Sequence, residues 1–300
     1  MKLAIIGCGE VGRLYAAAAA SAFDVIMCDT FPSQPARDCA RSLTVELKED
    51  IGEWLSEMDR IWACVPGEAA DAATEAALPF LRRDAVYVDL STATAAGKKV
   101  MGERMSARGV AYVDAAIMGA VALTGLQTPI LLSGREAEAA VADFANITAR
   151  ARALSDGEPG DAMTLKLLRT LLTKGIEALG VECLIAAESQ GVRDELYLVL
   201  DDINQAGFTQ FLNAVVRTHV VHAERRSHEV QRAVAQLTQI GLPGTVLAGT
   251  SARYEQTVQA LRESPPAPGA ADHIDSAVDW LLKTTLQTPL PAPLSALPAN

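Results

Sequence analysis

The chain has few of the residues that mark disulfide-rich or metal-binding proteins. It holds four histidines and five cysteines among 300 residues. The cysteines are odd in number and lack the spacing of metal ligands, which argues against a disulfide framework and against a zinc site. We therefore expect free thiols in a reducing cytoplasm and no bound metal. The five are Cys8, Cys28, Cys39, Cys64 and Cys183.

Long apolar runs and basic charge are also scarce. No apolar stretch approaches the length of a membrane span, and Glu10 and Arg13 interrupt the amino-terminal stretch that superficially resembles an export signal. The 26 lysines and arginines face 37 aspartates and glutamates, a formal net charge of −11. This charge opposes binding to nucleic acid or to anionic lipid. An anionic substrate must therefore be held by a local cationic pocket.

What the chain does have is a glycine motif near its amino terminus. An apolar run, Leu3 to Ile6, leads into Gly7-Cys8-Gly9-Glu10-Val11-Gly12, and an alanine-rich helix pattern follows. In this spacing the first glycine permits a tight turn, the second lets a pyrophosphate approach the backbone, and the third lets the helix pack on the strand. The start of the helix adds free N–H groups for phosphate. The motif predicts a dinucleotide site at Gly7, Gly9, Glu10, Val11 and Gly12.

The next apolar run, Phe23 to Cys28, ends at Asp29, about 20 residues after the first glycine. An acidic side chain here accepts a hydrogen bond from a ribose 2′-hydroxyl and repels a 2′-phosphate. The sequence therefore favours NAD over NADP. Arg37 and Arg41 could still reach a 2′-phosphate, so NADP stays an alternative.

Alternating strand and helix patterns continue through the first half of the chain. They predict a Rossmann domain, a doubly wound parallel sheet, at residues 1–158. Ligands of such sheets bind at the carboxyl ends of the strands, which places Cys64, Val65, Pro66 and the segment Asp89 to Thr92 at the cofactor crevice. Further strands are expected at 60–65, 85–90, 111–114 and 129–133, with helices at 67–81, 94–107 and 136–151.

The breaker cluster Gly157 to Gly160 marks a domain boundary, and helical periodicity replaces the strand patterns beyond it. We predict an all-helical domain at 159–285 and a proline-rich tail at 286–300. The first helix, 163–190, is apolar around most of its circumference, so we expect it to be buried, with a homodimer supplying the cover. Later helices are expected at 196–200, 209–237, 244–261 and 271–283, with a proline-rich linker at 264–268 before the last.

One stripe of this long helix is polar and begins at Lys166. A buried ammonium is costly unless it is paired or neutral. Lys166 therefore either extends its amine to solvent or has a pKa lowered by burial, which would suit a general base. The residues alone leave both alternatives open.

Four segments, in this order, resemble the β-hydroxyacid dehydrogenase family, which includes 3-hydroxyisobutyrate, tartronate semialdehyde and 6-phosphogluconate dehydrogenases. They are the glycine loop, Asp89-Leu90-Ser91-Thr92, the run Tyr112 to Ala120, and Gly160 leading to Lys166. The resemblance implies hydride transfer between NAD and a β-hydroxy acid or sugar acid. It implies that Lys166 is the catalytic acid/base and that Ser91 and Gly119 hold the substrate. The full set predicted to bind substrate is Ser91, Thr92, Gly119, Thr170 and Lys174.

The chain also departs from the family pattern. Thr170 stands where an asparagine is usual, and Met118 and Ala120 replace a serine and a glycine, which implies altered substrate recognition. Thr173 stands where decarboxylating relatives carry a glutamate, which argues against assisted decarboxylation. Arg169 and Lys174 add positive charge that would suit a carboxylate or phosphate, or else form solvated or paired helix charges.

The second half is similar to a helical domain of undefined role found in bacterial 6-phosphogluconate dehydrogenase-like proteins. The similarity covers much of residues 160–230 and implies no particular substrate. Within it, His222, Arg225, Arg226 and Glu229 share one helical face. This cluster is either a salt-bridged surface or, where helical domains interlock in a dimer, part of an active site.

Two rival functions stay open. One is an imine reductase, although members of that class usually carry aspartate or tyrosine where Lys166 stands. The other is a non-catalytic sensor that binds NAD and signals through its helices. The expected partner is a small-molecule anionic substrate, and a panel of hydroxy acids, sugar acids and cyclic imines would separate the three functions.

Overall fold

The computed structural model describes residues 1–287. They form two compact units, Met1–Leu172 and the residues from Thr173 onward. The division lies within one long helix, α7 (Asp161–Ser189), later in the chain than the breaker cluster at 157–160. The reason is physical, because the first turn of α7 is hydrogen-bonded to strands of the first unit.

The first unit is built on an eight-stranded sheet in the order β3-β2-β1-β4-β5-β6-β7-β8. Neighbours from β3 through β6 pair in parallel, which confirms the predicted doubly wound Rossmann sheet. One correction applies, since β7 runs antiparallel to β6 and carries β8 in parallel with itself. No long helix crosses the sheet between β6 and β7, so the chain returns antiparallel. The strands are β1 (Lys2–Ile6), β2 (Asp24–Cys28), β3 (Glu46–Lys48), β4 (Arg60–Ala63), β5 (Val86–Asp89), β6 (Ala111–Ile117), β7 (Ile130–Ser133) and β8 (Ala151–Ala153).

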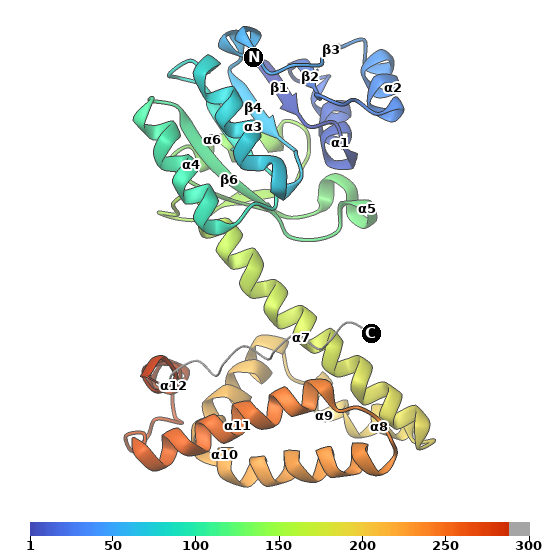
Figure 1. Cartoon of the computed structure of the whole chain (residues 1–300), viewed down its shortest axis with the longest axis vertical. Helices are drawn as coiled ribbons and strands as arrows, with labels where there is room; N and C mark the ends of the chain where they lie inside the picture. The colour runs from blue at the N-terminus through green and yellow to red at the C-terminus, as the bar shows by residue number, and fades with distance from the viewer. Residues whose placement is uncertain (288–300) are drawn as a thin grey trace, which may run out of the picture. The chain divides into compact units, whose positions relative to one another are not determined.

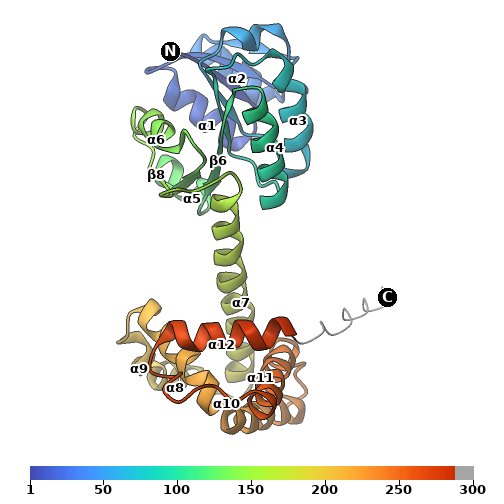
Figure 2. The ribbon, with the colours of Figure 1, turned by 90° about the vertical axis from the view of Figure 1, so that its left-hand side faces the viewer.

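Helices cover both faces of this sheet (Figure 2). One face carries α1 (Glu10–Ala19), α2 (Gln34–Leu43) and α6 (Ala137–Ala145), and the other carries α3 (Ala70–Ala77) and α4 (Ala95–Ala107). Alternate residues of β1 show the division: Leu3 and Ile5 join the first core, and Ala4 and Ile6 join the second. Burial on both faces explains why the strands are continuous apolar runs in the sequence.

The elements of the first unit that were not predicted include α2, β3, β8 and the four-residue helix α5 (Val121–Thr124). The two strands are three residues long, too short for a period-two pattern to identify them. A local signal for α2 does exist, because the Ser33 hydroxyl accepts a hydrogen bond from Ala36 N and a proline lies in the first turn. The helix predicted at 136–151 ends earlier, at Ala145, and makes room for β8.

The second unit is helical, as predicted (Figure 1). The proline-rich linker separates α11 (Thr245–Glu263) from α12 (Ile274–Gln287). The chain turns at Gly241, and α11 packs against α10 (Phe208–Gln239). Residues from 288 on, which include most of the predicted tail, lie outside the described residues. Among the described helices, none is both long and apolar enough to cross a membrane. After α7 come α8 (Arg193–Val199), α9 (Asp201–Asn204), α10 (Phe208–Gln239), α11 (Thr245–Glu263) and α12 (Ile274–Gln287).

The long helix α7 forms as predicted but is largely exposed within one chain. Leu171 is 73% exposed, and Ile176, Leu179 and Ile185 are exposed as well. The expectation that this helix is buried is therefore wrong for a single copy of the chain. Much of its apolar circumference is therefore exposed, although Ala186 and Ala187 near its end are buried.

Candidate cofactor and catalytic site

The turn between β1 and α1 has the geometry that its glycines predict. Gly7 has a φ of +89°, and a Cβ there would lie 2.9 Å from the backbone of Cys64. A Cβ at Gly12 would lie 1.9 Å from the Gly7 carbonyl oxygen, whereas one at Gly9 would meet no atom within 4 Å. Gly9 is also the N-cap of α1, which has no side-chain cap. The turn is thus tightly packed at Gly7 and Gly12 and open at Gly9, where the first N–H groups of α1 can bind a phosphate.

The segment after β4 lies against this turn. Cys64 N donates to Ile6 O at 2.7 Å, and a Cβ at Gly7 would touch Val65 Cγ1. Pro66 follows at the start of the next helical turn. The structure therefore brings Cys64 and Val65 together with the glycine turn, as the sequence predicts for a cofactor crevice. Glu10 and Val11 open α1 at the same place.

The two cysteines of this crevice are held as neutral thiols. Burial raises the pKa of the Cys8 thiol to about 12 and also raises the pKa of Cys64. Since thiolates are the reactive form, neither residue has the character of a nucleophile.

Asp29 follows β2 beside the glycine turn. Its Oδ2 accepts from Cys8 N at 2.8 Å, and its Oδ1 accepts from Phe31 N at 3.0 Å. The two arginines that could favour a 2′-phosphate are paired with carboxylates on the surface. Arg37 contacts Glu49 at 2.5 Å, and Arg41 is paired with Asp38. The geometry fixes a carboxylate, rather than a guanidinium, at this edge of the crevice.

A buried group of charges lies where β5 and β6 meet α4. Lys98 of α4 is 1% exposed, and its Nζ donates to Asp89 O at 2.9 Å. The same Nζ lies 2.8 Å from Asp114 Oδ1 and 3.4 Å from Asp89 Oδ2. The contact with Asp114 Oδ1 is an ion pair that leaves this oxygen without an aligned hydrogen bond. The Tyr112 hydroxyl donates to Asp89 Oδ2 at 2.6 Å. We call these four residues, Asp89, Lys98, Tyr112 and Asp114, the Lys98 cluster.

The Lys98 cluster is joined directly to the start of α7. Asp114 Oδ2 accepts from Met163 N at 2.8 Å, and Ser133 Oγ accepts from Ala162 N at 3.1 Å. Just before the helix, Gly160 has a φ of +100°, and a Cβ there would lie 2.6 Å from Ala95 O. These contacts hold the first turn of α7 on the sheet.

Lys166 lies one helical turn after Met163 and is half-buried. Burial lowers the pKa of its amine, the charge of Lys98 lowers it further, and Asp114 raises it. The net direction is a pKa below that of an ordinary lysine. A proton-transferring lysine needs this property near neutral pH.

The predicted substrate residues of the first unit lie at several degrees of exposure. Ser91 is 2% exposed; its N–H donates to Asp89 Oδ1 at 2.8 Å, and its Oγ accepts from Ala93 N at 3.2 Å. Thr92 and Gly119 are exposed. The Thr170 hydroxyl donates to Lys166 O at 2.8 Å. Ser91 thus contacts the Lys98 cluster through Asp89, and its hydroxyl still has a proton to donate.

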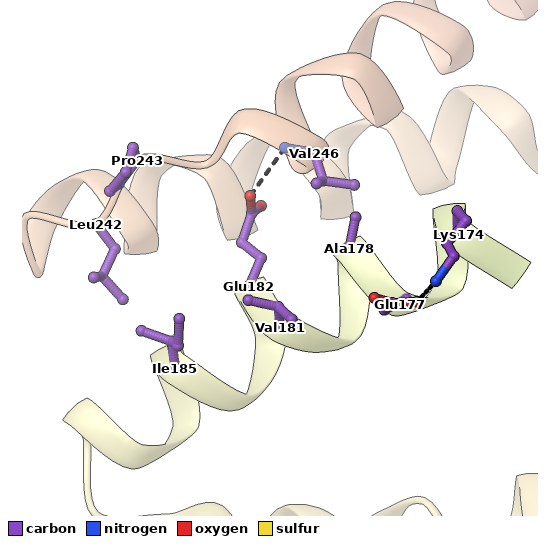
Figure 3. Close-up of a pocket in the computed structure, with 9 residues that line it drawn as sticks. All are labelled: Lys174, Glu177, Ala178, Val181, Glu182, Ile185, Leu242, Pro243 and Val246. Atoms are coloured by element: carbon purple, nitrogen blue, oxygen red, sulfur yellow. Dashed lines mark hydrogen bonds and ion pairs between the residues drawn. The ribbon is translucent and has the colours of Figure 1, made fainter. Parts of the chain in front are cut away.

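Lys174 belongs to the second unit, where Figure 3 shows its ion pair with Glu177. Both line a mainly apolar pocket of about 380 Å³. Glu182, in the same pocket, accepts from Val246 N at 2.9 Å (Figure 3). It also accepts from Leu247 N at 3.0 Å. Glu182 therefore caps the start of α11.

The face around His222 is internally paired within one chain. Arg225 forms an ion pair with Glu229, and Arg226 donates to the Thr218 hydroxyl at 2.9 Å. His222 itself is exposed. These contacts agree with the reading of this face as a salt-bridged surface.

Lys98 is the residue that the sequence analysis missed. A signal was present, because Lys98 shares the buried face of α4 with Met101, Gly102 and Met105. A lysine on the apolar face of a helix is the same observation that singled out Lys166. Its two carboxylate partners come from other strands, so the sequence does not identify them.

Two family models match the chain. Residues 2–149 match the NAD-binding domain of 6-phosphogluconate dehydrogenase, and residues 187–257 match a domain of unknown function (DUF1932). The first match confirms the dinucleotide-binding domain predicted from the glycine motif. The second confirms that the chain carries a helical domain of the kind to which its second half was compared.

Relatives are distant in sequence but similar in fold. An uncharacterized 28.5 kDa protein of Methanothermus fervidus is 24% identical over 232 residues, which cover 77% of this chain and 88% of that protein. A conserved protein of unknown function, described as structurally similar to 3-hydroxyacid dehydrogenases, is 24% identical with a TM-score of 0.62, covering 95% and 99% of the two chains. An imine reductase from Aspergillus terreus, solved with NADPH4 and dibenz[c,e]azepine, is 20% identical with a TM-score of 0.73, covering 93% and 98%. At these identities the likeness shows a shared fold.

Proposed function

Because this chain belongs to the family that carries the NAD-binding domain of 6-phosphogluconate dehydrogenase, we propose that it is an oxidoreductase of β-hydroxy acids or related sugar acids. One observation carries the proposal. A half-buried lysine with a lowered pKa, Lys166, adjoins the Lys98 cluster on β5 and β6. The carboxyl ends of the parallel strands share one edge of the sheet, so Lys166 and the glycine turn serve the same crevice.

In the proposed reaction, Gly7, Gly9, Gly12 and the segment from Cys64 to Pro66 hold the cofactor. The nicotinamide, when bound, supplies the hydride chemistry. During oxidation, neutral Lys166 accepts the proton of the substrate hydroxyl; during reduction, its ammonium returns a proton to the carbonyl oxygen. The Ser91 hydroxyl, Thr92 and the loop at Gly119 orient the substrate.

The direct test replaces Lys166. Lys166→Met should lower turnover by roughly 10²- to 10⁴-fold, the usual contribution of a positioned acid/base. NAD affinity, measured by calorimetry, should stay nearly unchanged because the glycine turn holds the pyrophosphate. Thr170→Ala, which changes one neighbouring hydroxyl, should cost less. Near-normal turnover of Lys166→Met with an unchanged pH profile would overturn the proposed mechanism.

An imine reductase is a second candidate. The fold likeness to such an enzyme, together with Met118 and Ala120 in the substrate loop, favours testing it. A panel of hydroxy acids, sugar acids and cyclic imines, followed by absorbance of the reduced nicotinamide, separates the two activities. NAD binding without turnover of any member would instead favour a non-catalytic sensor. Release of stoichiometric carbon dioxide from a hydroxy acid would contradict our expectation, from Thr173, that decarboxylation is not assisted.

We expect NAD to be preferred over NADP. The support is the carboxylate of Asp29, fixed by Cys8 N and Phe31 N at the crevice edge. Calorimetric titration should give a smaller Kd for NAD⁺ than for NADP⁺. Asp29→Asn should reduce the difference between the two Kd values, since it removes the charge that repels a 2′-phosphate while keeping an acceptor oxygen. Tighter binding of NADP⁺ to the unchanged protein would contradict the preference.

We also propose that the protein is a homodimer in which a second copy covers α7. Exposed apolar residues run along this helix, among them Leu171, Ile176, Leu179 and Ile185, and exposed patches of this kind mark interaction surfaces. Sedimentation at micromolar concentration should give a dimer. Ile176→Glu with Ile185→Glu should yield monomers, whereas Leu123→Glu, at the exposed Leu123 of the short helix α5 (Val121–Thr124), should not. A stable monomer of the unchanged chain would refute the dimer.

A cytoplasmic location fits the cysteines. All five are free thiols, which a reducing compartment maintains. Cell fractionation would test this, and recovery of the protein outside the cytoplasm would contradict it.

A further inference from the structure

Lys98 is a fully buried charge to which the proposed reaction gives no task. Removing an ammonium from water is costly, and a buried ion pair is often no more stable than an apolar replacement. Yet α4 directs Lys98 toward two carboxylates, with Asp114 Oδ1 at 2.8 Å and Asp89 Oδ2 at 3.4 Å. Tyr112 and the Asp89 carbonyl oxygen complete its surroundings. A cluster of this kind needs a reason beyond stability.

We propose that Lys98 and Asp114 are positioning residues for Lys166: Asp114 fixes the helical turn that leads to Lys166, and the charge of Lys98 acts on its amine. The proposal rests on the proposed function in assigning Lys166 the acid/base role. The proposed reaction gives neither Lys98 nor Asp114 a contact with the substrate, and both are buried.

The two oxygens of Asp114 carry the positional part of the argument. Oδ1 faces Lys98 Nζ, and Oδ2 accepts from Met163 N at the first turn of α7. One carboxylate therefore joins α4 to α7 across β6. Since Lys166 stands one turn beyond Met163, its amine is placed by the same carboxylate that pairs with Lys98.

The electrostatic part follows from the charges around Lys166. Among the described residues, Lys98 from α4 and Asp114 from β6 act on its amine, with opposite signs. Asp89 of β5 contacts Lys98, and the Tyr112 hydroxyl donates to that carboxylate. Burial raises the pKa of Tyr112, so this hydroxyl stays a neutral donor. Loss of Lys98 should therefore favour the protonated form of Lys166, and loss of the Asp114 charge should favour the neutral form.

The test measures the protonation of Lys166 without relying on turnover. The full-length protein is labelled with acetic anhydride across a pH series, and acetylation of the Lys166 peptide is followed by mass spectrometry. At a fixed neutral pH, the labelling rate should fall roughly tenfold in Lys98→Met and rise by a similar factor in Asp114→Asn. Lys99→Met, the same change at the exposed neighbour on α4, and Tyr112→Phe, a neutral change within the Lys98 cluster, should leave the rate unchanged.

The outcomes separate the possible roles. Shifts in opposite directions support the proposal; no shift, or shifts in one direction, overturn it. Lys98→Met leaves two carboxylates uncompensated, so where it does not fold, Asp114→Asn decides, since its amide oxygen still accepts from Met163 N. Opposite shifts without turnover of any substrate would keep the positioning role while refuting the oxidoreductase. Turnover with no shift in either variant would refute the positioning role while keeping the oxidoreductase.

Discussion

The glycine turn makes opposite demands on two positions, and this allows a matched test. A methyl group at Gly12 would lie 1.9 Å from the Gly7 carbonyl oxygen, so the backbone would have to move. A methyl group at Gly9 would meet no protein atom within 4 Å, and the backbone there, φ −65° and ψ −162°, suits alanine. The same substitution should therefore damage the fold at Gly12 and the ligand site at Gly9.

The magnitudes follow from these contacts. Overpacking against backbone costs roughly 1–3 kcal/mol or more, so Gly12→Ala should lower the free energy of unfolding by at least that amount. Gly9→Ala loses a favourable N-cap but reduces the freedom of the unfolded chain, and these effects of about 0.5–1 kcal/mol nearly cancel. Its methyl group would, however, occupy the space in which a pyrophosphate approaches α1. NAD affinity should fall with stability unchanged.

Urea denaturation and calorimetric titration with NAD⁺ measure the two quantities separately. Gly9→Ala should unfold near the denaturant midpoint of the unchanged protein and bind NAD⁺ more weakly. Unchanged NAD⁺ affinity in this variant, or destabilisation as large as that of Gly12→Ala, would refute our account of the turn.

Three further predictions concern charged groups. Glu182→Ala should cost about 1–2 kcal/mol of unfolding free energy in chemical denaturation because it uncaps α11, whereas Glu177→Ala, which breaks a surface ion pair, should cost less than about 1 kcal/mol; equal costs would contradict the capping role. Arg60→Met should lower the free energy of unfolding by about 3–5 kcal/mol, because it leaves the buried Asp143 carboxylate without its ion-pair partner. Arg82→Met, at the more exposed pair with Asp59, should lower it far less. If Lys166 is the base, the rate of hydroxy acid oxidation should rise with pH through a pKa below that of an ordinary lysine, and this limb should vanish in Lys166→Met.

The sequence predicts the structure best where the local backbone geometry accepts only one residue type. Gly7, Gly9 and Gly12 have separate tasks within one turn, so their spacing identified the dinucleotide fold directly. Short edge strands such as β3 and β8 have no such local signal. For α7, periodicity showed an apolar circumference, yet it could not show whether the same chain covers it, because that depends on tertiary and quaternary contacts.

The Lys98 cluster shows why Lys98 and its pairing with two carboxylates escape prediction, and why these residues depend on one another. Asp89 and Asp114 are direct neighbours in the register of β5 and β6, and like charges opposite each other destabilise a sheet. The pairing places two carboxylates together that are far apart in sequence, and only the strand order reveals it. Lys98, on α4, offsets the repulsion between these two carboxylates. The pairing of β5 with β6 at this position therefore depends on Lys98. The same carboxylate that needs Lys98 also holds the first turn of α7. Any change in the balance of these charges therefore reaches Lys166 through both its position and its protonation.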